Sequence, residues 1–514
     1  MKVILLSGGF GKRLFPLSRQ YYPKQYIPIF NGKSLFELTI DRFNEENEIF
    51  VLTNKISLSF LENFRKGYKK DFKTIYEPFS KNTAVSIEYA LQFFEDEDTI
   101  GVFPVDHLIN DIKNFQNCIS KAITLTDDSI VLIGIEPKKI ETRFGYIEYN
   151  DNNVISFREK PDFELAKKYY ESKRFLFNSG IYIFKKRIMQ EQIQKFAGQI
   201  YDIGNQIGKL LKEKNLKIEN SFYPDIKIEN LFQKFPSISI DYAVIEKTDK
   251  LKVVKGEFDW NDLGNIDSLT NTLSNSISSD FGSSKKFHEI SFFQIFDNDK
   301  NIDRNITKAE TVDDNSNGKI FNDSDNNFCG NKIIGLNGKI YGIIGYSDCK
   351  IIDTEDVLLL IKDGYSDNID KFYKWIENDT KKADTTKYHK TVLKPWGYFK
   401  DLYMNNNYSE DNDKYDEKNS CYKIKIIKIN KGEQISLQIH KYREEYWTII
   451  EGNGKVIIED KEYYAEKGKQ FFIPKNIRHQ AIASKESELV FVEVQIGQII
   501  SEEDIIRLKD IYNR

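Results

Sequence analysis

A glycine-rich turn near the start of the chain constrains the fold more than any other feature. The apolar run Val3–Leu6 predicts a short buried strand. Three glycines follow that strand, namely Gly8, Gly9 and Gly11, and three cations come after them, namely Lys12, Arg13 and Lys24. Glycine lets backbone N–H groups approach an anion closely, and lysine or arginine neutralises its charge. The turn therefore predicts a polyphosphate-binding loop at the end of a strand.

Two familiar phosphate-binding loops do not fit this turn. A P-loop has Ser or Thr directly after Gly-Lys, whereas Arg13 follows Lys12 here. The dinucleotide fingerprint has a third glycine where this chain has Leu14. We therefore expect a nucleotide site of another class.

Residues 1–270 alternate apolar runs with helical stretches. The predicted strands are Val3–Leu6, Ile49–Thr53, Ile100–Pro104, Ile130–Ile135 and Ile181–Phe184, and helical segments between them include Ala84–Glu95 and Phe115–Thr124. This alternation predicts a Rossmann-like α/β domain with a mostly parallel sheet and helices on both faces. Ligands of such sheets bind beyond the carboxyl ends of the strands, where the glycine turn would lie.

The rest of the chain predicts two further regions. Residues 271–390 combine polar stretches with short apolar pieces over residues 320–362, which favours a linker and a structural β-solenoid-like spacer. Residues 391–514 carry short strands separated by turn signals, which predicts an all-β sandwich or barrel. Within them, Tyr403–Ser420 is polar and predicts a mobile loop.

Composition narrows the class of protein. A chain of 514 residues predicts two to four domains, and no apolar run approaches the ~18 residues of a membrane span. The N-terminus lacks the features of a signal peptide. The four cysteines form no CxxC pair, which favours a reducing cytoplasm and argues against a cysteine zinc site. The net charge of −4 offers no global basic surface for a nucleic acid.

Two aspartates follow apolar strands in the first region. Asp106 stands in GVFPVDH and Asp262 in FDWNDLG. Both would lie at strand ends and face the phosphate turn. Two carboxylates together with substrate phosphates are typical of an Mg²⁺ site. The sequence therefore predicts that Asp106 and Asp262 hold Mg²⁺.

The string from Gly8 to Lys24 resembles the signature of sugar-1-phosphate nucleotidylyltransferases. Further motifs resemble the bacterial two-domain mannose-1-phosphate guanylyltransferases, and they are Glu77-Pro78, Asn82–Ala84, Phe157–Pro161, Phe177–Gly180 and Ser239–Lys247. The resemblance implies attack by a mannose 1-phosphate oxygen on the α-phosphorus of GTP, which gives GDP-mannose and pyrophosphate. Arg13 and Lys24 would offset the phosphate charge, and Mg²⁺ on Asp106 and Asp262 would activate the α-phosphate.

The same resemblance assigns binding residues. It implies nucleotide contacts at Gly8, Gly9, Gly11, Lys12, Asn82 and Thr83. It implies sugar or sugar-phosphate contacts at Gly145, Glu159, Lys160 and Asn178. Two stretches depart from the family pattern, because this chain has Arg143–Ile147 where relatives show GYGYI and Asp262–Ile266 where they show DVGSW. These departures leave the identity of the hexose open.

The C-terminal region resembles a cupin barrel with a divalent metal site. The spacing of its two motifs assigns the ligands Gln438, His440, Glu445 and His479, with Gln438 in place of the usual first histidine. Asn476 and Ala483 also replace a usual Gly and Asn. The ligand set suits Zn²⁺ or a similar ion.

This cupin resembles phosphomannose isomerases. Lys394–Gly397, Glu493–Gly497 and the tail Glu503–Arg514 fit that family. The resemblance implies a second reaction, the interconversion of fructose 6-phosphate and mannose 6-phosphate. The metal would organise the sugar oxygens, and Arg507 or Arg514 would pair with the phosphate. Tyr442 and Tyr446 stand where many relatives have His, so the proton-transfer base stays unassigned.

Two other interpretations stay open at this point. The chain could be a guanylyltransferase for another sugar 1-phosphate, such as a heptose, with an inactive cupin. The cupin could also be a metal-stabilised sugar-binding or oligomerisation module. The sequence leaves the oligomeric state open, a homo-oligomer included.

Overall fold

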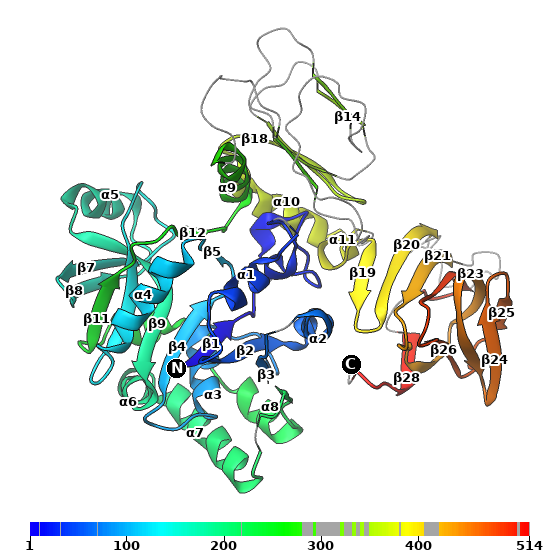
Figure 1. Cartoon of the computed structure of the whole chain (residues 1–514), viewed down its shortest axis with the longest axis horizontal. Coiled ribbons are helices and arrows are strands. Elements are labelled where there is room, and N and C mark those ends of the chain that lie inside the picture. Colours follow the sequence, from blue (N-terminus) through cyan, green and yellow to red (C-terminus); the bar gives the residue numbers. More distant parts are fainter. Residues whose placement is uncertain are drawn as a thin grey trace. The chain divides into compact units, whose positions relative to one another are not determined.

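The computed structural model describes residues 1–9, 11–30, 32–68, 70–216, 218–279, 291–294, 319–322, 332–335, 340–343, 349–379, 382–405, 421–500 and 504–512. The chain divides into two compact units, drawn in Figure 1. Unit 1 comprises Met1–Ser57 and Lys69–Thr386, and unit 2 comprises Leu58–Tyr68 and Lys387–Arg514. Among the described helices, none is long and apolar enough to cross a membrane.

Unit 1 is built on a ten-stranded sheet in the order β10-β3-β2-β1-β4-β9-β6-β11-β8-β7. The strands are β1 (Lys2–Leu6), β2 (Glu48–Asn54), β3 (Lys73–Glu77), β4 (Thr99–Pro104), β6 (Ile130–Ile135), β7 (Tyr146–Asn150), β8 (Asn153–Arg158), β9 (Phe175–Lys185), β10 (Ser221–Phe222) and β11 (Leu251–Lys255). The five strands from β10 to β4 run parallel, as does the pair β6–β11. Strand β9 is antiparallel to both of its neighbours β4 and β6.

Eight helices in the described part of unit 1 accompany this sheet, and four of them bury one large apolar core against it. They are α1 (Leu35–Asp41), α3 (Thr83–Leu91), α4 (Ile112–Ile123), α5 (Phe163–Ser172), α6 (Lys186–Phe196), α7 (Gly198–Glu213), α8 (Ile226–Gln233) and α9 (Ile266–Ser279). Residues of α3, α6, α7 and α8 share one cluster with Ile4, Ile75 and Val102 of the sheet. Each such side chain contributes roughly 1.5–3 kcal/mol by leaving water. Figure 1 shows α4 on the other side of the sheet from α6.

Local signals explain where these helices begin. The Ser34 hydroxyl accepts from the Glu37 amide while the Glu37 carboxylate accepts from the Ser34 amide, a capping box that starts α1. Asp111, Asp162 and Asp225 cap α4, α5 and α8 through their carboxylates. These caps fix the loops that follow the strands.

A small two-stranded sheet lies after β4. Strand β5 (His107–Leu108) pairs antiparallel with β12 (Asn261–Asp262), and Asp262 stands opposite His107. This pairing brings a late segment of unit 1 to the end of β4. Asp106 and Asp262 thereby come from the same small sheet or its edge.

The described part of residues 271–386 adds short strands and two helices to unit 1. The elements are β13 (Ser291–Gln294), β14 (Lys319–Asn322), β15 (Lys332–Gly335), β16 (Ile340–Ile343), β17 (Cys349–Asp353), β18 (Leu358–Lys362), α10 (Ile369–Glu377) and α11 (Asp384–Lys387), which ends at the first residue of unit 2. β13, β15 and β17 pair in parallel, as do β14 and β16. Parallel pairing of every second strand is what a β-solenoid produces.

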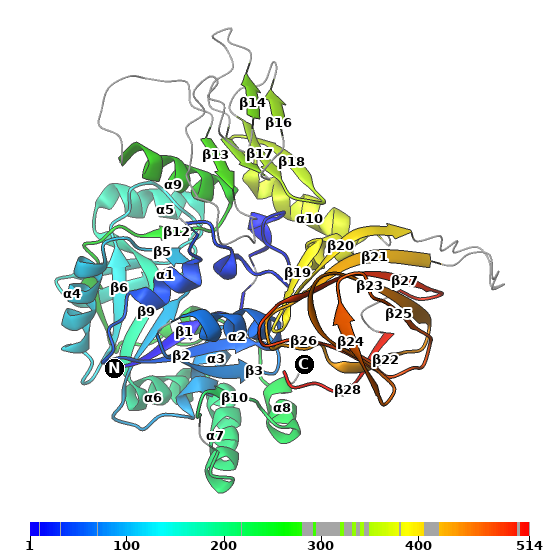
Figure 2. The same ribbon diagram turned by 45° about the vertical axis from the view of Figure 1, so that its right-hand side comes forward.

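Unit 2 is a curved antiparallel sheet, as Figure 2 shows, and its strands enclose a buried apolar core. Its strands are β19 (Thr391–Lys394), β20 (Gly397–Asn405), β21 (Cys421–Ile429), β22 (Leu437–His440), β23 (Arg443–Ile458), β24 (Lys461–Glu466), β25 (Gln470–Ile473), β26 (His479–Ala483), β27 (Leu489–Gly497) and β28 (Ile505–Lys509). The core includes Trp447, Ile429, Val456 and Phe491. Most of the predicted loop Tyr403–Ser420 lies outside the described residues.

Helix α2 (Leu58–Gly67) belongs to unit 2 although it lies between β2 and β3 in the sequence. The Asn63 side-chain amide donates to the Lys394 carbonyl at 3.2 Å. No periodicity in the sequence predicts this assignment, because it depends on packing against a strand more than 300 residues away.

Candidate functional site

The glycine turn of unit 1 presents its cations on two short 3₁₀ helices. Lys12 and Arg13 lie on the first (Lys12–Leu14), and Lys24 opens the second (Lys24–Tyr26). Gly11 has φ +75°, and a Cβ there would stand 2.6 Å from Cδ of Lys24. Only glycine combines that backbone with such close contact. The sequence prediction that one loop gathers these cations is consistent with this geometry.

Lys24 forms the central ion pair of the site. Its Nζ lies 2.8 Å from Oδ2 of Asp106, and the lysine is buried. Burial opposes the lysine charge, but the charges of Asp106 and Asp262 outweigh it and raise the pKa of Lys24, while Arg13 lowers it. Burial likewise disfavours the Asp106 anion, and Lys24 overcomes this and holds the pKa of that carboxyl below its ordinary value. Both groups are therefore charged at neutral pH.

Asp262 approaches the same place through the β5–β12 pairing. A Cβ on Gly264 would stand 3.3 Å from Oδ2 of Asp262 and 3.5 Å from Nη1 of Arg143. Arg143, one of the departures from the family pattern, therefore flanks this aspartate. Its Nε donates to Glu141 at 2.9 Å. The pKa of the buried His107 is lowered by burial, although Asp106 and Asp262 oppose this.

The two aspartates suit a hard divalent cation. Carboxylate oxygens, supplemented by phosphate oxygens and water, are the ligands that Mg²⁺ takes. The charges of both carboxylates favour the protonated forms of Lys24 and His107. Both carboxylates therefore lie close to these two residues. The donor set fits Mg²⁺ delivered with a nucleotide.

The other side of the glycine turn meets β3 and α3. A Cβ on Gly8 would stand 3.7 Å from Oε2 of Glu77, whose Oε1 accepts from the Ser86 hydroxyl at 2.6 Å. Burial raises the pKa of Glu77 to about 7. Asn82 caps α3 by accepting from the Thr83 amide at 2.8 Å. Their predicted contacts to a nucleotide stay predictions.

A second group of predicted residues gathers around Gly145. The backbone N–H of Asn178 donates to the Gly145 carbonyl at 2.8 Å. A Cβ on Gly145 would stand 2.5 Å from Oε2 of Glu159 and 3.4 Å from Cβ of Asn178. Lys160 donates to Oε1 of Glu159 at 2.7 Å. Four residues that the sequence assigned to sugar binding thus lie together in unit 1.

Asp241 is a member of this group that sequence reasoning missed. Its Oδ1 accepts from the Tyr182 hydroxyl at 2.5 Å and from the Asn178 side-chain amide at 3.0 Å. Burial raises the pKa of Asp241, and burial together with the charge of Asp241 raises the pKa of Glu159. The sequence signal for Asp241 is its place in the Ser239–Lys247 motif, which resembles the family pattern.

Unit 2 brings together all four predicted metal ligands. The Nε2 atoms of His440 and His479 lie 3.1 Å apart, and each is 3.3 Å from Nε2 of Gln438. Oε1 of Glu445 lies 3.1 Å from Nε2 of His440. His440, Glu445 and His479 are the group of described residues whose donor atoms can hold a metal ion. Rotation of the Gln438 side-chain amide by 180° exchanges its nitrogen and oxygen atoms. The oxygen, which can ligate a metal, would then face the two histidines.

The hydrogen bonds behind these ligands prepare them for a cation. Nδ1 of His479 lies 2.9 Å from the Ile477 carbonyl. That contact places the ring proton on Nδ1 and leaves Nε2 as a lone-pair donor. Burial lowers the pKa of His479 to about 4, so its ring is neutral at pH 7. The Glu445 pKa lies well below its ordinary value, because His440, His479 and Arg443 overcome the effect of burial.

Arg507 reaches the same interior from β28. It stands opposite Gln438 in the register of β22 and β28, so both side chains share one face of the sheet. Arg514, the other predicted phosphate partner, lies outside the described residues. The structure therefore brings one of the two arginines to the side of the predicted metal ligands.

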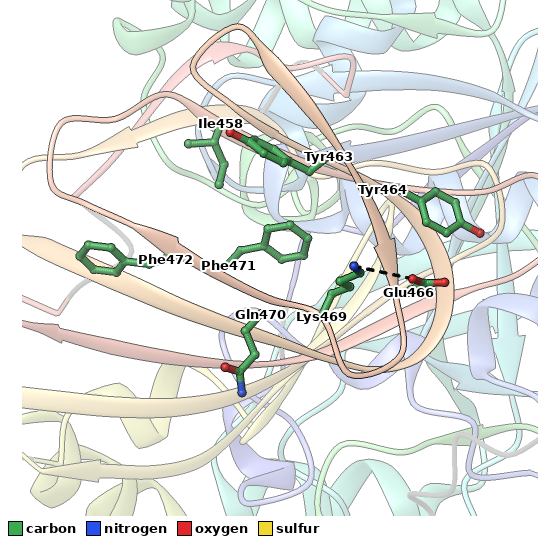
Figure 3. Close-up of a pocket in the computed structure, with 8 residues that line it drawn as sticks. All are labelled: Ile458, Tyr463, Tyr464, Glu466, Lys469, Gln470, Phe471 and Phe472. Carbon is green, nitrogen blue, oxygen red and sulfur yellow. Dashed lines mark ion pairs between the residues drawn. The ribbon is translucent and has the colours of Figure 1, made fainter.

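A pocket of about 430 Å³ is lined by residues of β23, β24 and β25, and none of the four predicted metal ligands lines it (Figure 3). Ile458 stands opposite His479, and Phe471 stands opposite Trp447. The Tyr463 and Phe471 rings, whose centroids are 6.2 Å apart, form part of its wall. The volume is within the range of small-molecule sites.

Two stretches of the sequence match known families. Residues 2–278 match the family described as Nucleotidyl transferase. Residues 381–510 match the family described as Mannose-6-phosphate isomerase C-terminal. The first match includes both clusters of unit 1, and the second includes the metal ligands.

Several known proteins are similar over most of the chain. Alginate biosynthesis protein AlgA of Pseudomonas aeruginosa is 27% identical over 99% of this chain and 97% of its own length. Mannose-1-phosphate guanylyltransferase 2 of Escherichia coli O157:H7 is 27% identical over 99% of this chain and 98% of its own. A crystal structure from Thermus thermophilus, described as a mannose-1-phosphate geranyltransferase, has a TM-score of 0.57 at 20% identity. It covers 73% of this chain and 98% of its own, and it supports the fold.

Proposed function

Because the chain belongs to the nucleotidyl transferase family and carries a mannose-6-phosphate isomerase C-terminal domain, we propose that it makes GDP-mannose from GTP and mannose 1-phosphate. The Lys24–Asp106 ion pair beside the glycine turn is the observation that carries the proposal. It provides a buried, charged pair where a strand ends, which is where an α/β sheet binds its ligand. The names of the similar guanylyltransferases support mannose as the sugar.

The reaction needs positioning more than a protein nucleophile. A phosphate oxygen of mannose 1-phosphate attacks the α-phosphorus of GTP, and the bond to the leaving pyrophosphate breaks. Arg13 and Lys24 offset the negative charge of the triphosphate in the transition state. Glu159 and Asn178 orient the hexose, with Asp241 behind them. Holding the two substrates in this way converts a bimolecular reaction into an effectively unimolecular step within the bound complex.

Asp106 and Asp262 would hold Mg²⁺ during this transfer. The ion would supply Lewis-acid activation of the α-phosphate. The residues themselves set its place, because Lys24 keeps Asp106 ionised. The backbone amides and cations of the turn bind the remaining phosphate oxygens.

We further propose that unit 2 interconverts fructose 6-phosphate and mannose 6-phosphate with a bound divalent metal, Zn²⁺ in the first instance. The observation in favour is the set of Gln438, His440, Glu445 and His479 with their donor atoms facing one another. The metal would organise the sugar oxygens, and Arg507 would pair with the phosphate. The product mannose 6-phosphate differs from mannose 1-phosphate, the sugar substrate proposed for unit 1, only in the position of its phosphate.

One substrate screen tests the guanylyl transfer. The full chain is incubated with GTP, Mg²⁺ and several sugar 1-phosphates, and pyrophosphate release is measured. Fastest release with mannose 1-phosphate supports the proposal, whereas fastest release with a heptose 1-phosphate would replace it.

The His440→Ala/His479→Ala double variant separates the two units. We expect it to lose its metal by elemental analysis and to lose fructose 6-phosphate isomerisation, while pyrophosphate release is unchanged. Unchanged metal content would contradict the site. Loss of metal from a chain whose parent shows no isomerisation would favour a binding module.

A further inference from the structure

A segment that lies between the two family matches packs directly on the phosphate turn. Residues 349–379 follow the first match and precede the second. They form β17, β18 and α10 within unit 1. One buried apolar cluster joins them to the turn, and it includes Leu14, Phe15 and Leu17 of the turn and Ile352, Ile369, Tyr373 and Ile376 of the segment. The two parts therefore cannot move independently without exposing apolar surface.

Tyr373 of α10 makes the contacts nearest to the catalytic cations. Its side chain is 1% exposed. Its ring meets Phe15 edge-to-face at a centroid distance of 5.5 Å and an angle of 90°. Nζ of Lys12 lies 5.0 Å from the centroid of the same ring, within the range of a cation–π contact. The Tyr373 ring thus contacts Lys12, which precedes Arg13, and Phe15, which follows Leu14.

Arg19 provides a second attachment between the turn and the segment. Its guanidinium is fully buried, and Nη2 donates to Asp356 at 2.8 Å and to Thr354 at 3.2 Å. Its Nε donates to the Pro16 carbonyl at 2.9 Å. An arginine whose fork donates to several acceptors at once is rigidly oriented. The residues after the turn are therefore fixed by the same segment.

Arg13 is exposed between these fixed points. Lys12 before it lies over Tyr373, and Leu14 and Phe15 after it are buried. We propose that Tyr373 is a positioning residue for GTP binding, which holds Lys12 and Arg13 toward the triphosphate although it lies outside the nucleotidyl transferase match. This inference rests on the proposed guanylyl transfer. It predicts that the segment 349–379 is part of the nucleotide site and not only a spacer.

Matched variants of the full chain test the proposal. Tyr373→Leu keeps an apolar side chain but removes the ring, Tyr373→Phe keeps the ring, and Trp375→Leu makes the same ring-to-leucine change at a residue of α10 that is 67% exposed. We expect Tyr373→Leu to raise KM for GTP roughly fivefold or more, as loss of a cation–π contact implies. KM for mannose 1-phosphate should stay within about twofold, and the other two variants should match the parent.

Two outcomes would overturn the proposal. One is an unchanged KM for GTP in a folded Tyr373→Leu protein, and the other is an equal rise in both KM values. If Tyr373→Leu does not fold by circular dichroism, Asp356→Asn decides, because it weakens the Arg19 attachment at a carboxylate that is 15% exposed. It should raise KM for GTP in the same selective way, and an unchanged value would refute the inference.

Failure of the proposed function has a different signature. If the parent transfers no guanylyl group to any sugar 1-phosphate, the affinity for GTP with Mg²⁺ is measured directly by calorimetry. A weaker affinity in Tyr373→Leu than in Tyr373→Phe would then still support the positioning role. Equal affinities would refute it.

Discussion

Adding a methyl group at Gly11 tests whether the phosphate turn and Lys24 act as one unit. The new Cβ would stand 2.6 Å from Cδ and 2.8 Å from Cγ of Lys24, whereas ordinary contacts begin at 3.4 Å. Lys24 must therefore withdraw by about 1 Å, and its 2.8 Å bond to Asp106 opens or is redirected. A misplacement of about 1 Å at a catalytic group costs about 10²-fold in rate, which corresponds to about 2.7 kcal/mol.

The left-handed backbone adds a separate effect on stability. Gly11 has φ +75°, and an alanine there costs roughly 1–2 kcal/mol. Gly364→Ala is the matched control, because Gly364 has φ +84° and no atom lies within 4 Å of its Cβ position. It carries the same backbone strain without contact to Lys24.

The assay is kcat/KM for pyrophosphate release from GTP and mannose 1-phosphate, with urea unfolding of both variants. Gly11→Ala should lose about 10²-fold in kcat/KM, and Gly364→Ala should keep the parent value. Both should lose roughly 1–2 kcal/mol of unfolding free energy from the backbone strain, and Gly11→Ala should lose more, because it also displaces the buried Lys24. Activity of Gly11→Ala within threefold of the Gly364→Ala value would refute the role assigned to Lys24.

Individual carboxylates of unit 1 give three further predictions. Asp262→Asn should abolish Mg²⁺-dependent transfer and leave fructose 6-phosphate isomerisation intact, whereas Asp259→Asn, at a carboxylate that accepts from the amides of Asn110 and Asp111, should retain transfer. Asp241→Asn should raise KM for mannose 1-phosphate about tenfold with KM for GTP unchanged, because it weakens the support of Asn178, and an equal effect on both constants would contradict the assignment of the residues around Gly145 to sugar binding. Burial raises the pKa of Glu77 to about 7, so this group favours the folded state fully below pH 4.5 and loses that contribution as the pH rises through 7. In urea titrations between pH 4.5 and 8, the parent should therefore lose about 3 kcal/mol of unfolding free energy that the Glu77→Gln variant does not lose. A difference between the two proteins that stays constant with pH would exclude a raised pKa.

The sequence predicted what local pattern encodes. Val3–Leu6 and Ile130–Ile135 are apolar runs buried inside a sheet, so strands β1 and β6 were found at or within one residue of their ends. The expected strand Ile181–Phe184 lies within the longer β9, which begins at Phe175 and includes Asn178, a buried polar residue beside Gly145. The polar Asn178 and Ser179 interrupt the apolar run, so the hydrophobicity pattern alone does not predict that the strand continues through them.

Contacts distant in sequence were harder to predict. The four cupin ligands follow a motif with fixed spacing, and the structure brings their donor atoms together. Tyr373 and Lys12 are separated by more than 350 residues, and the sequence around each residue does not indicate that the two are in contact. Their contact follows from the packing of α10 on the turn, which only tertiary structure defines.

The most direct test of the account is the stoichiometry of one reaction. The purified chain is given GTP, mannose 1-phosphate and Mg²⁺, and GDP-mannose and pyrophosphate are measured together with an Asp106→Asn variant as the control. We expect equal amounts of both products from the parent and neither from the variant. Pyrophosphate release without GDP-mannose, or full activity of Asp106→Asn, would contradict it.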